Sequence, residues 1–282
     1  MLMIVSGALC TMQVSAVQEK QEGILAPNDN TMPLISGLNG DVKWTLRPDG
    51  ILSFDRGTFK NSITADLRRM NRDYPFCVKK IVFTAPVSTE SSLFLFTSLP
   101  LEDIEGLEHL DTSRQETMDL MFSGLSKLKR LDLRSFNTSG AHSMRGMFAE
   151  GLLSTPPGLE YLDLSSFDMR QGVDTTSMFE GASCLKVLTL GKNFRFDGWS
   201  KASTNIGLPE IKKTAAYTGY WQDLGDGGTL NNPKGKHVFT SDQLMKCYDG
   251  KTMAGTFVWQ PTRGLSIDLK EKTNGKSNCT IS

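Results

Sequence analysis

One phrase recurs three times between Leu107 and Leu190, and it limits the possible folds more than any other feature of this chain. Each copy contains a Met-Phe pair and, further along, a Leu-x-x-Leu-x-Leu pattern. The pairs are Met121-Phe122, Met147-Phe148 and Met178-Phe179, and the leucine patterns begin at Leu128, Leu159 and Leu185. A phrase repeated at this spacing is typical of structural units that stack on one another and bury a shared core.

The spacing of the copies shows where the repeat tolerates additional residues. Phe148 follows Phe122 by 26 residues, whereas Phe179 follows Phe148 by 31 residues. The extra residues lie before Leu159, in a segment that contains Pro156 and Pro157. An insertion in a Pro/Gly segment predicts a loop at that place, because loops accept additions that a stacked core does not.

Two periodicities inside each copy predict a helix and a strand. Met118, Met121 and Phe122 lie at i, i+3 and i+4, which places them on one face of a helix. Alternation in residues 131–133 predicts a strand with two leucines inward and Asp132 outward. The methionines are interpreted as core residues rather than as a soft binding groove. The sequence therefore predicts an α/β fold, a short right-handed solenoid with a ladder of parallel strands.

The segments on either side of the repeats are interpreted as caps. Alternating residues flank a Pro48-Asp49-Gly50 turn, which predicts an N-terminal β-hairpin. Thr240 precedes a predicted helix start in a C-terminal α+β cap. The predicted organisation is a signal peptide at 1–16, a flexible spacer at 17–40, an N-terminal cap with a degenerate first coil at 41–106, the repeats at 107–190, the C-terminal cap at 191–261, and a polar tail or linker at 262–282.

Charge and the N-terminal residues indicate the environment of the chain. There are 31 basic and 31 acidic residues, scattered along the sequence, which argues against nucleic acid or an anionic membrane as a partner. Residues 1–16 are apolar but too short to span a bilayer, and they close on the small residue Ala16. This pattern predicts a secretory leader whose positively charged beginning lies upstream of Met1, and hence an extracellular or cell-surface protein.

Cysteine, histidine and motif content argue against a metal site and against catalysis. The cysteines beyond the leader include no Cys-x-x-Cys pair, Cys184 is interpreted as a core residue, and one bridge among Cys77, Cys247 and Cys279 is left open. The chain has only three histidines, none of them beside a nucleophile motif, and it lacks a Gly-x-Ser-x-Gly elbow and a phosphate loop. We therefore expect no enzyme activity, cofactor or metal.

The outward positions of the predicted strands supply the candidate binding residues. If the strands are parallel neighbours, Arg130, Tyr161 and Val187 form one column, and Asp132, Asp163 and Thr189 form another. Hydrogen bonds to nearby serines, or water, relieve the repulsion of the two aspartates in the favoured interpretation, and a calcium ion is the less favoured one. The partner-binding candidates are Lys129, Arg130, Tyr161, Pro156 and Pro157.

The combined phrase resembles a known repeat. Met-Phe-x-Gly followed by Leu-x-x-Leu-Asp-Leu and Ser-Phe-(Asn/Asp) is similar to the BspA-type leucine-rich repeat of bacterial surface proteins. The aromatic segments from Tyr217 to Pro261 resemble the tail of lactic-acid-bacterial members, although Arg134, Met169 and Thr175 depart from the pattern. The resemblance implies a leucine-rich-repeat solenoid and adhesion to host, matrix or other cells.

Three functions outside catalysis remain open. The first is binding of an extracellular protein or matrix ligand, with mucin or a glycan among the partners considered. The second is a structural spacer that projects another module. The third and weaker one is carbohydrate binding by the aromatic residues Tyr217, Tyr220, Trp221 and Trp259.

Overall fold

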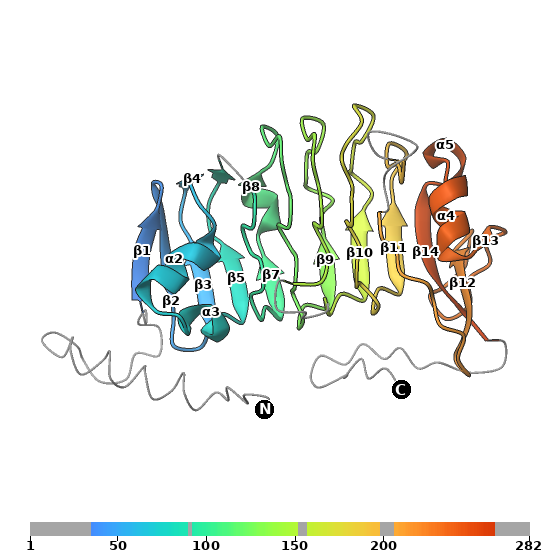
Figure 1. Cartoon of the computed structure of the whole chain (residues 1–282), viewed down its shortest axis with the longest axis horizontal. Helices are drawn as coiled ribbons and strands as arrows, with labels where there is room; N and C mark the ends of the chain where they lie inside the picture. Colours follow the sequence, from blue (N-terminus) through green and yellow to red (C-terminus); the bar gives the residue numbers. More distant parts are fainter. Residues whose placement is uncertain (1–34, 90–91, 152–156, 198–205, 263–282) are drawn as a thin grey trace, which may run out of the picture.

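The computed structural model describes residues 35–262 except 90–91, 152–156 and 198–205. They form an elongated molecule in which successive strands lie side by side (Figure 1). The first sheet contains β1 (Ile35–Asn39), β2 (Val42–Leu46), β3 (Ile51–Phe54), β5 (Lys80–Phe83) and β7 (Asp103–Glu105) in that order. The second has the order β13 (Val238–Phe239), β12 (Tyr217–Asp223), β14 (Gly255–Pro261), β11 (Val187–Leu190), β10 (Tyr161–Leu164), β9 (Arg130–Asp132). The third consists of β4 (Gly57–Phe59), β6 (Val87–Thr89) and β8 (Leu110–Asp111).

The prediction of an α/β leucine-rich-repeat solenoid is wrong. The described chain is mostly β, with three mixed or parallel sheets and few helices. The helices are α2 (Ile63–Met70), α3 (Tyr74–Cys77), the short 3-10 helix η1 (Leu107–His109), α4 (Ser241–Cys247) and α5 (Gly250–Met253). None of these described helices contains a Met-Phe pair, and none is long and apolar enough to cross a membrane.

The Met-Phe segments form turns instead of helices, and their backbone hydrogen bonds show why. Leu120 has a φ of 56°, in the left-handed region, which an α-helix does not accommodate. Its N–H donates to the carbonyl of Arg145 in the next repeat at 2.9 Å, and the N–H of Phe122 donates to the carbonyl of Met147 at 3.0 Å. The donors that a helix would use internally therefore connect neighbouring repeats.

The prediction that the repeated apolar residues form the core is confirmed. Met118, Met121 and Phe122 are fully buried although they are not helical. The phenylalanine rings form a continuous ladder through the repeats, with centroid distances of 5.7 Å for Phe96 to Phe122, 6.1 Å for Phe122 to Phe148 and 5.7 Å for Phe148 to Phe179. Phe96, also fully buried, extends this ladder into the segment before the first Met-Phe copy.

The predicted register of the three repeat strands is also confirmed. β9, β10 and β11 are parallel, and Arg130 pairs with Tyr161, which pairs with Val187. Leu131, Leu162 and Leu188 lie next to one another on the buried face. Because side chains alternate along a strand, the residues on either side of each leucine project outward.

The N-terminal part forms a separate sheet that contains a hairpin. β2 and β3 pair antiparallel across the Pro48-Asp49-Gly50 turn, as predicted, and β3 pairs in parallel with β5. Residues 35–39, which fall within the predicted spacer, form β1 and pair with β2. The rest of that spacer and the predicted signal peptide lie outside the described residues.

The C-terminal part covers the last repeat by strand pairing. β14 lies antiparallel to β11, so the edge of β11 is occupied. Residues 191–197 form no strand; the rings of Phe194 and Phe196 are buried, and the ring centroid of Tyr248 lies 5.7 Å from that of Phe196. Helix α4 begins after Thr240, whose side chain and that of Gln243 form a capping box, and this confirms the predicted start.

The third Met-Phe copy contains a buried hydroxyl that has no hydrogen-bond partner, which gives a stability prediction. Thr175 occupies the position of Met118 and Met144, is fully buried, and has no partner for Oγ1. We expect Thr175→Val to raise the free energy of unfolding by about 1 kcal/mol, because an unsatisfied buried polar group is removed without a change in shape. Urea denaturation measures the change.

The adjacent threonine supplies a control of opposite sign. The Oγ1 of Thr176 donates to the Asp174 carboxylate at 2.6 Å. Thr176→Val should therefore lower the free energy of unfolding by about 1 kcal/mol. Equal effects of the two substitutions would contradict the conclusion that the Thr175 hydroxyl is buried without a hydrogen-bond partner.

Candidate functional site

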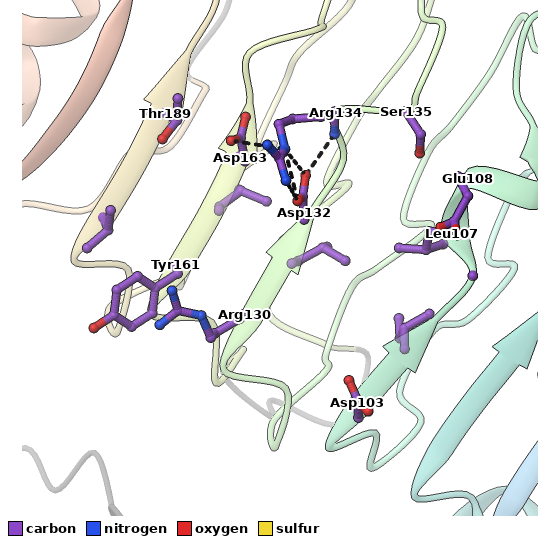
Figure 2. A pocket seen from close by; sticks show the side chains of 15 residues that line it. Asp103, Leu107, Glu108, Arg130, Asp132, Arg134, Ser135, Tyr161, Asp163 and Thr189 are labelled. Carbon is purple, nitrogen blue, oxygen red and sulfur yellow. Dashed lines mark hydrogen bonds and ion pairs between the residues drawn. The ribbon is translucent and has the colours of Figure 1, made fainter. Parts of the chain in front are cut away.

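A groove with a volume of about 740 Å³ lies across the outward face of β7, β9, β10 and β11. We call it the strand-face groove. Figure 2 shows its lining, which includes Asp103 of β7, Glu108 of η1, Arg130 and Asp132 of β9, Tyr161 of β10 and Thr189 of β11. Parallel pairing of β9, β10 and β11 brings their outward residues together, and the residues of β7 and η1 join them from the end of the first sheet.

Arg134 bridges the two aspartates that the strand register places side by side (Figure 2). Its Nη2 lies 2.5 Å from Asp132 Oδ2, and its Nε lies 3.9 Å from Asp163 Oδ2. The guanidinium of Arg134 hydrogen bonds to Asp132 and holds the pKa of that carboxyl below its usual range. The backbone N–H of Ser165 also donates to Asp163 Oδ1 at 2.9 Å. The favoured interpretation of hydrogen-bonded carboxylates therefore holds in part, and Arg134 is the partner that it did not include.

Arg130 and Tyr161 form a second pair in the groove. The guanidinium carbon of Arg130 lies 3.8 Å from the centroid of the Tyr161 ring. This distance is that of a cation–π contact, in which the planar guanidinium covers the ring face. Within the described ranges Arg130 has no carboxylate partner, so its N–H donors are available to a ligand.

Lys129 is occupied by an ion pair outside the groove. The Glu160 carboxylate lies 3.3 Å from the Lys129 ammonium group and 3.2 Å from that of Lys186. These three residues sit in one row of the strand ladder, just before Arg130, Tyr161 and Val187. Lys129 therefore stabilises the row of charges and does not line the groove.

The inserted loop does not join the site in the described part of the chain. Pro156 lies outside the described residues, and Pro157 is buried and does not line the groove. Of the five predicted binding residues, the structure brings together Arg130 and Tyr161. Sequence reasoning missed Asp103, Glu108 and Arg134 as lining residues. Arg134 was noticed only as a departure from the repeat pattern, since the next repeat has Ser165 at the same position, and it was not assigned to the site.

The predicted sugar-stacking face is not formed by Trp221. This ring is 1% exposed, and its Nε1 donates to Ser241 Oγ at 3.0 Å. Trp259 is half-buried with its ring 5.2 Å from that of Tyr217, in an edge-on arrangement. Tyr220 is exposed. Because a sugar stacks on an open ring face, Trp221 serves the core of the C-terminal part instead.

Metal-binding and cysteine chemistry are limited in the residues that the structure describes. No group of three or more His, Cys, Asp or Glu side chains there is placed to hold a metal ion. Cys184 is buried in the last repeat, as expected, but it is disulfide-bonded, as is Cys77, whereas Cys247 is a free, exposed cysteine.

The Arg134 bridge gives a pH prediction. A folded-state pKa of Asp132 below its value of about 3.9 in an unfolded chain means that ionised Asp132 favours folding above that value. This contribution is lost as the pH falls through the folded-state pKa. We expect Arg134→Ala to raise the titration midpoint of Asp132, because the donated hydrogen bonds are removed while Asp163 remains beside it. Carboxyl-carbon NMR during an acid titration measures the midpoint.

Arg170 provides a matched control for that titration. Arg170 hydrogen bonds to Asp168 and lowers the pKa of that carboxyl in the same way. Arg170→Ala should raise the midpoint of Asp168 and leave that of Asp132 unchanged. An Asp132 midpoint that does not respond to Arg134→Ala would contradict the bridge.

Comparison with known proteins places the repeats near one family. Residues 91–191 match the model of a family described as Mycoplasma protein of unknown function, DUF285. The match covers less than half of the 282 residues, so it shows what this stretch is similar to. The predicted resemblance to BspA-type leucine-rich repeats is wrong, because the matching family model is a different one. No curated protein and no solved structure matches the chain.

Proposed function

We propose that this chain is a repeat protein that binds a partner protein through the strand-face groove. The observation that carries the proposal is the groove itself, which spreads over four strands and presents Arg130 stacked on Tyr161. Arginine and tyrosine are enriched where protein interfaces gain most of their binding energy. The strand pairing on either side fixes their position before a ligand arrives, which lowers the entropy lost on binding.

We also propose that the chain is exported and that its binding mediates adhesion. The apolar residues 1–16, which lie outside the described residues, support export to the cell surface or beyond. A partner would then be an extracellular or matrix protein, or a protein on another cell, and binding would mediate adhesion.

A structural spacer is the second candidate. The ladder of phenylalanines and the hydrogen bonds between successive repeats run through the elongated molecule (Figure 1). Such a continuous core suits a rod that holds another module away from a surface. A spacer needs no ligand, so binding measurements separate the two candidates. The burial of Trp221 counts against the carbohydrate-binding alternative.

The test uses the full chain and a variant that fills the groove. Ser135 is exposed and lines the groove, whereas Ser126 is exposed and does not. Surface plasmon resonance against collagen, fibronectin, laminin and mucin should show saturable binding to at least one of them. We expect Ser135→Trp to weaken that binding about tenfold or more by occupying the site, while Ser126→Trp leaves it unchanged. Absence of saturable binding to all four would favour the spacer.

A further inference from the structure

The charges of the strand-face groove are mostly balanced within the protein. Asp103 lies 2.9 Å from the Lys80 ammonium group, and Asp132 and Asp163 share Arg134. Two lining charges have no ion-pair partner among the described residues, namely Arg130 on β9 and Glu108 on η1. The groove therefore offers one uncompensated positive group and, at the side near β7, one uncompensated negative group.

The Arg130 group is built for a planar anion. The contact with Tyr161 holds the guanidinium over the ring face, and the guanidinium carries its N–H donors in a planar fork. Two parallel donors match the two oxygens of a carboxylate. Figure 2 shows the stacked pair at one end of the groove and Glu108 on the opposite side of Asp132.

The remaining lining charges decide which anion fits. Asp103, Glu108, Asp132 and Asp163 line the groove together with only two arginines, Arg130 and Arg134. A phosphate or sulfate group, with its greater negative charge and several oxygens, would be repelled by these carboxylates. A single carboxylate at the Arg130 end brings one negative charge to the one uncompensated arginine. A basic group farther along the same ligand would meet Glu108.

We propose that the strand-face groove takes an extended peptide segment of the partner, with an acidic side chain on Arg130 and a basic side chain near Glu108. The inference rests on the proposed function and names the chemistry of its ligand. An extended peptide fits because it can cross four strands while presenting charged groups at separated positions. The charge pattern also fixes which charged side chain of the segment lies at Arg130 and which lies near Glu108.

The test measures charge selectivity directly. Three libraries of ten-residue peptides carry glutamate, lysine or alanine at one fixed central position and random uncharged residues elsewhere. Fluorescence anisotropy with the full chain should show that the glutamate library binds about tenfold more tightly than the alanine library, the range expected for a charge-assisted hydrogen bond. Arg130→Glu should reverse the preference in favour of the lysine library.

Matched variants distinguish this inference from a structural effect and from the proposed function. Arg145 is exposed, belongs to a Met-Phe segment and does not line the groove, so Arg145→Glu should leave the preference unchanged. An unchanged glutamate preference in Arg130→Glu, or the absence of any preference in the natural chain, would overturn the inference. If partner proteins still bind in a manner sensitive to Ser135→Trp, the proposed function stands without it.

Discussion

Replacing Phe148 by alanine is expected to lower the free energy of unfolding by about 3–5 kcal/mol. Phe148 is fully buried, and its ring stacks between Phe122 and Phe179 with interplanar angles of 6° and 14°. Removing the ring leaves a cavity at the centre of the ladder, where neighbours on both sides are fixed by backbone hydrogen bonds between repeats. Urea denaturation followed by circular dichroism measures the loss.

Phe76→Ala is the matched control for this prediction. Phe76 lies in α3 and is 51% exposed, so its removal should change the free energy of unfolding by about 0.5 kcal/mol or less. A loss below about 1 kcal/mol for Phe148→Ala would contradict the ladder as the core of the repeats.

Gly191→Ala is expected to lower the free energy of unfolding by about 2–3 kcal/mol through a backbone clash. Gly191 follows β11 and is buried, and a Cβ there would lie 1.9 Å from the carbonyl oxygen of Ser165 in the preceding repeat. Its own carbonyl accepts a hydrogen bond from the Tyr248 hydroxyl at 2.9 Å. A shift would therefore disturb both the repeat contact and the attachment of the C-terminal part. Thermal or urea unfolding measures the cost.

Gly140 tests whether space, rather than loss of glycine itself, sets that cost. A Cβ on Gly140 would have its nearest neighbour, the carbonyl oxygen of Ser113, at 3.4 Å. Gly140→Ala should change the free energy of unfolding by about 0.5 kcal/mol or less. Similar losses for the two alanine variants would rule out the clash at Gly191.

The core could be predicted from the sequence, and the backbone conformation of the repeats could not. Burial of the leucines and phenylalanines and the pairing of Arg130 with Tyr161 follow from periodicity alone. The helix prediction failed because a turn with one left-handed residue also buries positions i, i+3 and i+4. Gly146, with a φ of 56°, occupies the position of Leu120 in the next copy. A glycine there was the sequence signal that this position takes a left-handed conformation.

Part of the candidate site was also visible in the sequence. The outward column identified Arg130 and Tyr161, because strand alternation fixes which residues face out. Arg134 follows the strand and reaches back over it, and no periodic rule places such a side chain. Asp103 lies on β7 and lines the groove. It was not predicted because the segment around β7 lacks the leucine pattern of the later copies. The position of the strand-face groove therefore required the structure.

Site-specific photo-crosslinking tests the role of the groove most directly. A photoreactive benzoylphenylalanine is placed either at Thr189, which lines the groove, or at Arg145, which does not. Each full-length protein is irradiated with whichever of collagen, fibronectin, laminin and mucin binds it. We expect a covalent adduct from position 189 and none from position 145. An adduct from position 145 alone, or equal yields from both positions, would contradict partner binding through the strand-face groove.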